Sequence, residues 1–236
     1  MIVFGKNVAK EVISNNIKIN KVIVQKNFSD RGIIDYLENN NIERVFMDRR
    51  EMDFKYKGNH QGIVLDIEDY KYSDLKSISN ANFLVILDHL EDPHNFGAII
   101  RTCEAAGVDA IIIPKNRSVE VNSTVMKVSA GALTNIKIVE VNNLVNAIKE
   151  LKKNGFWVYG TDMEDSELYT KVDYTEKVVL VIGAEGNGIS RLVRENCDFV
   201  VNIPLLGKIN SLNASVAAGI VIYEIVRQRG EKWNYV

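Results

Sequence analysis

A cluster of polar side chains stands between an apolar run and a helix-like run in the stretch LDHLEDPHNFGAIIRTCEAAG, residues 87–107. Asn95 stands where the helix should begin, so its side-chain oxygen can cap the helix or hold a ligand. Arg101 should point away from the apolar stripe of that helix, either into solvent or toward an anionic group. His89 and His94 have carboxylates nearby, but no HxH, HxxxH or cysteine ligand completes a metal-binding set. We therefore expect no metal here.

A second segment whose residues could take part in binding or catalysis is VIGAEGNGIS, residues 181–190. Gly183, Gly186 and Gly188 permit unusual backbone angles and a close approach to a ligand. Their GxxGxG spacing, late in the chain, differs from the GxGxxG of a dinucleotide-binding fold and disfavours a nucleotide-dependent oxidoreductase. Glu185 among the glycines would repel a phosphate. It suits a cationic or hydroxyl-bearing ligand or an arginine partner, or it forms a salt bridge in a simple glycine-rich turn.

The third segment is VNIPLLGKINSLNASVAAG, residues 201–219. Asn210, Ser211 and Asn213 gather immediately before a helix whose first backbone amides lack intrahelical partners. Ser211 or Asn213 is therefore either a plain helix cap or part of a polar site. The small residues in 214–219 allow close packing against another helix, including one from a second subunit, or against a ligand.

The elements that position these segments alternate between strands and helices. Residues 1–68 predict a small α/β unit, and residues 69–80 a linker or irregular helix. Residues 81–236 contain nearly continuous Val/Ile/Leu strands separated by helices, which is typical of a mainly parallel sheet covered on both faces. Gly107 is placed to end the first of these helices in a left-handed conformation. Ligands of open α/β sheets bind at the carboxyl ends of strands, and all three segments follow such ends.

Composition sets limits on the class of protein. The chain has 236 residues, of which 46% are hydrophobic and 25% charged, as in ordinary globular proteins. The net charge of −2 argues against nonspecific nucleic-acid binding, so any RNA contact must come from local clusters. No stretch resembles a membrane span or a signal peptide. Cys103 and Cys197 lack CxxC spacing, which favours a reducing, cytoplasmic location with both as small core residues.

Taken together, the three segments resemble the three sequence motifs of the SpoU branch of the SPOUT RNA methyltransferases. The motifs are DPHNFGAIIRT, GAEGNG and IPLLGKINSLNASVAAG, and the similarity extends to KVSAGA, HQGIV and EIVRQR. Three motifs in the right order, over nearly the whole chain, make the resemblance specific. Within the branch the chain is most similar to bacterial 23S rRNA guanosine 2′-O-methyltransferases, whose ribosomal-protein-like N-terminal domain binds the substrate.

The resemblance implies a deep trefoil knot in the C-terminal domain, S-adenosylmethionine as the cofactor and an obligate homodimer with residues from both subunits at each site. Matched motif by motif, it implies that the cofactor contacts Gly183, Ile203 and Leu212. It implies a reaction centre made of Asn95, Arg101, Glu185, Ser211 and Asn213. Ala214, where relatives often carry valine, is the one small departure.

The chemistry of these residues agrees with ribose methylation, for which only RNA offers the 2′-hydroxyl. Methyl transfer from a sulfonium is an in-line displacement that needs alignment and loss of a proton, without a metal. Arg101 can stabilise the developing alkoxide and clamp a phosphate. In the family the arginine has been proposed as a general base, but the high pKa of arginine side chains favours electrostatic activation. We expect methylation of 23S rRNA. The alternatives are tRNA or another rRNA nucleotide, and a non-catalytic ribosome-assembly factor.

Overall fold

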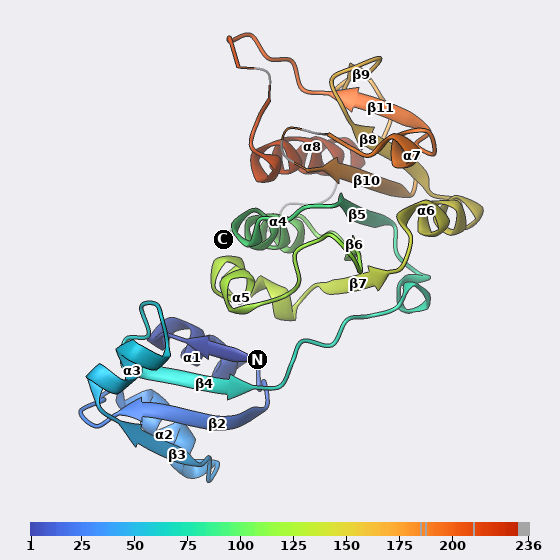
Figure 1. The fold of residues 1–236 in the computed structure, drawn as a ribbon. Coiled ribbons are helices and arrows are strands. Elements are labelled where there is room, and N and C mark those ends of the chain that lie inside the picture. The colour runs from blue at the N-terminus through green and yellow to red at the C-terminus, as the bar shows by residue number, and fades with distance from the viewer. Residues whose placement is uncertain (185, 187, 210, 231–236) are drawn as a thin grey trace. The chain divides into compact units, whose positions relative to one another are not determined.

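The computed structural model describes residues 1–184, 186, 188–209 and 211–230, which form two compact units (Figure 1). The first unit comprises Met1–Lys71 with Val121–Gly131, and the second begins with Tyr72–Glu120 and resumes at Ala132. No helix in the described part of the chain is long and apolar enough to cross a membrane.

The first unit contains a four-stranded sheet of order β1-β4-β2-β3. The parallel pair β2–β3 lies beside β4, which runs antiparallel to both β2 and β1. The strands are β1 (Ile2–Phe4), β2 (Ile19–Gln25), β3 (Arg44–Met47) and β4 (Ile63–Ile67). The helices are α1 (Lys6–Ser14), α2 (Arg31–Asn39), α3 (Arg49–Lys55) and α5 (Ser123–Ser129). The expected α/β pattern of residues 1–68 is present, with β1 and α3 as additional short elements.

The second unit contains a seven-stranded sheet of order β7-β6-β5-β10-β8-β11-β9, in which every pairing is parallel. Its strands are β5 (Phe83–Asp88), β6 (Ala110–Pro114), β7 (Lys137–Val141), β8 (Trp157–Thr161), β9 (Glu167–Leu168), β10 (Val178–Gly183) and β11 (Phe199–Asn202). Its α-helices are α4 (Pro93–Ala105), α6 (Leu144–Lys153), α7 (Arg191–Arg194) and α8 (Ala214–Arg229). The continuous apolar runs therefore predicted the parallel sheet correctly. Residues 72–80 hold a short 3₁₀ helix, Leu75–Ile78, and Ser73 donates its backbone N–H to the carbonyl of Ile138.

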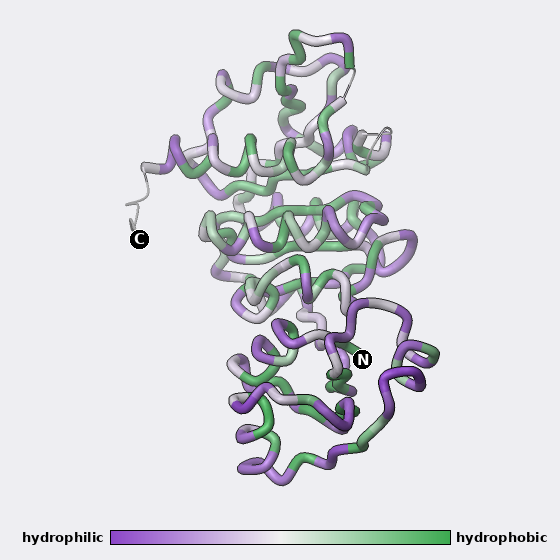
Figure 2. The backbone as a smooth tube through the Cα atoms, turned by 90° about the vertical axis from the view of Figure 1, so that its left-hand side faces the viewer, coloured by the Kyte–Doolittle hydropathy of each residue, from purple (hydrophilic) through white to green (hydrophobic). Residues whose placement is uncertain are grey.

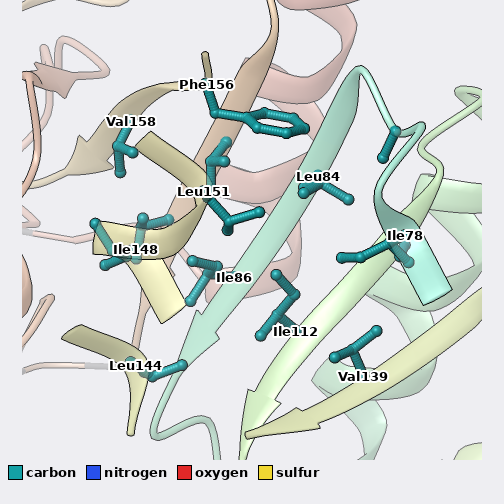
Figure 3. Packing of buried hydrophobic residues seen from close by; sticks show 14 of the residues in the cluster. Ile78, Leu84, Ile86, Ile112, Val139, Leu144, Ile148, Leu151, Phe156 and Val158 are labelled. Carbon is teal, nitrogen blue, oxygen red and sulfur yellow. The ribbon is translucent and has the colours of Figure 1, made fainter. Parts of the chain in front are cut away.

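The core lies on both faces of this sheet because its central strands are buried along their whole length. Leu84 and Ile86 of β5 face Ile148 and Leu151 of α6 in one apolar cluster (Figure 3). Alternate β5 residues point to the opposite face and are equally buried. In Figure 2 the helical segments contain both green and purple residues, as helices with a buried and an exposed side do.

The two cysteines are free thiols within this fold. Cys103 is fully buried on α4, and Cys197 is partly buried. Burial raises the pKa of both thiols, that of Cys197 to about 12. Both therefore stay protonated near neutral pH, in agreement with their expected role as small packing residues.

The chain doubles back tightly after β10. Ala184 and Gly188 form an antiparallel bridge, and Gly188 has a positive φ of 62°. A Cβ atom on Gly183 would lie only 2.1 Å from the carbonyl carbon of Gly188. The turn therefore requires glycine at position 183 for space and favours glycine at 188 for conformation.

Replacing Gly183 by alanine should destabilise the protein, because the backbone near Gly188 would have to move. Overpacking of this kind costs about 1–3 kcal/mol and should lower the Tm in a thermal unfolding experiment. Gly207→Ala is the matched control, since nothing lies within 4 Å of a Cβ added there. Its effect should stay within about 0.5 kcal/mol. An unchanged Tm for Gly183→Ala would contradict the close approach.

Candidate functional site

The first strand end carries a buried carboxylate that joins two of the loops. Asp88, the last residue of β5, is 1% exposed. Its Oδ2 accepts the backbone N–H of Ser190 at 2.6 Å, and its Oδ1 lies 2.6 Å from Nδ1 of His89. His89 itself has a φ of 57°, an uncommon conformation for a residue with a side chain. Asp88 thus holds the loop after β5 against the loop after β10.

The start of α4 differs from the sequence-based expectation by three residues. Asp92, not Asn95, is the N-cap, and its side chain accepts the backbone N–H groups of His94 and Asn95. Pro93 occupies the first helical position, where its missing N–H costs nothing and its fixed φ suits the helix. Asn95 therefore lies inside the first turn and is buried. Gly107 has a φ of 72° just beyond the helix, as expected.

The side chain of Asn95 meets that of Asn213 from the third segment. Asn213 is the N-cap of α8, and its Oδ1 accepts the backbone N–H groups of Ser215 and Val216. Because Oδ1 faces the helix, the Nδ2 of Asn213 points outward and donates to Oδ1 of Asn95 at 2.9 Å. Asn213 therefore serves both as the cap and as part of a polar site.

A cavity of about 430 Å³, here called the loop cavity, lies at the carboxyl ends of β8, β10 and β11. Gly183, Ile203 and Leu212, the three residues expected to contact a cofactor, all line it. Ser211, expected in the reaction centre, lines it as well. The structure therefore brings these four residues from the second and third segments to one space.

Asp162 is a further lining residue that the sequence analysis did not consider. It directly follows β8, and its Oδ1 accepts the backbone N–H groups of Met163 and Glu164 at 2.7 and 3.3 Å. Its Oδ2 lies 3.5 Å from Nε of Arg194. The carboxylate is thus held in place at the cavity wall. Asp162 could have been predicted as a site residue, because it directly follows the strand FWVYGT, whose carboxyl end lies at the same side of the sheet as the other segments.

A second cavity of about 430 Å³ is lined by Asp88, His89, Glu91, Asp92 and Asn95, together with loop residues that include Ser190. We call it the acidic cavity, and it shares the lining residues Ala184 and Gly188 with the loop cavity. Its carboxylates disfavour a phosphate and suit groups that donate hydrogen bonds. Within the described residues, no group of three His, Cys, Asp or Glu side chains is placed to hold a metal ion.

Among the described residues of the expected reaction centre, only Ser211 lines the loop cavity, whereas Asn95 lines the acidic cavity and Asn213 is joined to Asn95 by a hydrogen bond. Arg101 is exposed on α4 and is not among the described residues that line either cavity. Glu185 lies outside the described residues. The first segment thus contributes Asn95 beside Asn213, while its arginine is exposed and lines neither of these two cavities.

Comparison with protein families gives two matches that together span most of the chain. Residues 82–223 match the SpoU rRNA Methylase family, and residues 2–73 match the family described as RNA 2′-O ribose methyltransferase substrate binding. A Staphylococcus saprophyticus protein assigned to the TrmH family of tRNA/rRNA methyltransferases is 41% identical over 100% of this chain and 97% of its own length.

Two solved structures share the architecture. One is the SpoU methyltransferase AviRb from Streptomyces viridochromogenes in complex with AdoMet, with a TM-score of 0.80, 26% identity and coverage of 97% of this chain and 90% of that one. The other is an AdoMet-bound rRNA methyltransferase from Sinorhizobium meliloti, with a TM-score of 0.80, 25% identity and coverage of 96% and 86%. The expected fold class is therefore confirmed. The chain belongs to the SpoU rRNA methylase family.

Proposed function

We propose that this RNA methyltransferase transfers a methyl group from S-adenosylmethionine to the ribose 2′-oxygen of a guanosine in 23S rRNA. The hydrogen bond between Asn95 and Asn213 carries the proposal, because it joins the first motif to the third motif beside Leu212 and Ala214, which line the loop cavity. The choice of 23S rRNA and of guanosine rests on the similarity of the sequence to bacterial enzymes with that target. We place the enzyme in the cytoplasm with its RNA.

The loop cavity fits the cofactor in size and charge. S-adenosylmethionine has a permanently positive sulfonium and an ammonium group, and it supplies an electrophilic methyl group when bound. The described lining residues include Asp162 and Glu164 but no Lys, Arg or His. A volume of about 430 Å³ is within the usual range for small-molecule sites. We propose that Gly183, Ile203 and Leu212 contact the adenosine part of the cofactor and that Asp162 faces its positively charged sulfonium.

The reaction centre needs to align the 2′-oxygen with the methyl group and to help it lose its proton. We propose that Asn95, Asn213 and Ser211 position the ribose, while Arg101 stabilises the developing negative charge on the 2′-oxygen. Arginine side chains stay protonated, which suits this electrostatic role better than that of a base. Glu185 would orient Arg101 or Asn95.

Arg101 can take this role if it reaches the loop cavity of a second subunit. We therefore propose a homodimer with two shared sites, formed by a symmetric pair of identical surfaces. The exposed side of α8 supports such an interface. Val216 and Tyr223 are large hydrophobic residues that are exposed there, and they lie on the same face of the helix about two turns apart. The small residue Gly219 lies between them and permits close approach.

The proposal is tested by mapping 2′-O-methyl groups in rRNA and tRNA from cells with and without the protein. We expect one guanosine in 23S rRNA to lose its 2′-O-methyl group when the protein is absent, and to regain it when the purified enzyme acts on that RNA. Loss of a tRNA methyl group would replace 23S rRNA by tRNA as the substrate. A map that does not change would favour the non-catalytic assembly factor.

The Asp162→Asn variant should bind S-adenosylmethionine roughly 10-fold more weakly, because the amide removes a negative charge facing the positive cofactor. Isothermal titration calorimetry measures this without methyl transfer. S-adenosylhomocysteine, which lacks the sulfonium charge, should lose much less affinity for the same variant. Glu176→Gln is the matched control, since Glu176 is exposed and does not line the loop cavity. An equal loss for both ligands would contradict the assigned role of the charge.

A further inference from the structure

Several chain segments meet at one edge of the small sheet in the first unit, namely the edge formed by the ends of its strands. The pair Gln25–Met47 ends the register of β2 with β3, and Val24–Ile63 begins that of β4 with β2. Residues that follow β2 and β3 therefore lie at the same edge as those that precede β4, next to α3 (Figure 1). Gly5 joins them by donating its N–H to the carbonyl of Ile63. We call the segments 5–6, 26–31 and 48–62 the basic edge.

The basic edge is positively charged although the unit as a whole is not. Residues 1–70 contain 11 Lys and Arg and 11 Asp and Glu. The basic edge holds seven of the positive residues and four of the negative ones, which leaves four positive and seven negative residues for the remainder. The net charge of residues 1–70 is therefore zero although the positive residues are concentrated at the basic edge. This edge is suited to binding a polyanion.

The carboxylates of the basic edge are engaged in contacts within the protein. Asp48 accepts Nζ of Lys26 at 3.0 Å, and Asp53 lies 2.8 Å from Nε2 of His60. Glu51 accepts the backbone N–H of Asp48 in a capping box at the start of α3. Two of the positively charged side chains of the basic edge, in contrast, form no ion pair within the described part of the chain.

Arg50 and Lys57 form no ion pair with any residue in the described part of the chain. Both side chains are exposed. They are therefore available to an external anion.

An aromatic ring lies on the exposed face of the same helix. Phe54 is 89% exposed, whereas Met52 of α3 is fully buried against Ile23 and Val64. Two residues along a helix point in nearly opposite directions, so anchoring Met52 in the core turns Phe54 to solvent. Arg50 is four residues before Phe54 and shares its face. The helix thus presents an exposed aromatic ring beside an exposed cation.

We propose that an unpaired RNA nucleobase stacks on Phe54, while Arg50 and Lys57 contact the neighbouring phosphates. This inference rests on the proposed function, since it specifies how the first unit holds the RNA substrate. Stacking on an exposed aromatic side chain with nearby cations is a common way to bind single-stranded RNA. Paired bases in an A-form duplex hide their faces, so the site selects a loop, bulge or single strand.

Fluorescence anisotropy tests the proposal with the full-length protein and a labelled hairpin RNA that carries 2-aminopurine in its unpaired loop. Phe54→Ala and Phe54→Leu should each lower the affinity by about 10-fold, because both remove the aromatic face. Phe54→Tyr should retain the affinity of the unchanged protein, and only the proteins with an aromatic ring should quench 2-aminopurine.

Phe46→Ala is the matched control. Phe46 is 59% exposed on β3, but its neighbours Val45 and Met47 pack against the α3 side of the sheet, so Phe46 points to the other face. This variant should bind the hairpin normally. A fully paired duplex should be bound equally by the unchanged protein and by Phe54→Ala.

The charge variant Arg50→Ala/Lys57→Ala should reduce the slope of log affinity against log salt by about 1.4, as expected for two lost phosphate contacts on single-stranded RNA. Unchanged hairpin affinity for Phe54→Ala, or an equal loss for Phe46→Ala, would overturn the stacking site. That result would be distinct from a failure of the proposed function, which is read from the map of 2′-O-methyl groups and not from hairpin affinity.

Discussion

The hydrogen bond from Asn213 to Asn95 is the constraint on which the site depends, and it joins residues 118 positions apart. Each amide is fixed by the start of a helix. Asp92 caps the turn that holds Asn95, and the Oδ1 of Asn213 caps α8. With one end of the Asn213 amide committed to the helix, the other end can only donate outward. The contact is partly buried, with Asn95 buried and Asn213 exposed, so breaking it removes a hydrogen-bond partner from a buried amide.

The loop that follows β10 is held in place by other contacts. The parallel sheet brings the ends of β5 and β10 to the same edge, where Asp88 stands opposite Gly183 in the register. Asp88 then binds the backbone of Ser190, and the missing side chain of Gly183 lets the chain return to Gly188. The loop cavity is therefore a consequence of sheet geometry, one buried carboxylate and one close backbone approach. These features suit a ligand that is bound largely through backbone groups.

Several features could be predicted from sequence because they are local. Continuous apolar runs indicated the parallel sheet, and Asn213 was a candidate cap because it precedes an apolar helix. The helix start at Asn95 was wrong by three residues because Asp92 and Pro93 form a better start. The pairing of Asn95 with Asn213 and the role of Asp162 at the cavity wall depend on tertiary structure. The same holds for the basic edge, since its charges come from three segments and the charges of residues 1–70 as a whole balance to zero.

Mixed dimers test most directly whether a site combines the asparagine pair of one chain with Arg101 of the other. Arg101→Ala removes the proposed positive charge, and Asn213→Asp keeps an oxygen for the helix cap but loses the donor to Asn95. Each variant alone should fail to methylate rRNA. In a dimer of one Arg101→Ala chain and one Asn213→Asp chain, one site would be intact, so about half the activity per dimer should return if the sites act independently. A mixed dimer without activity would contradict the shared site.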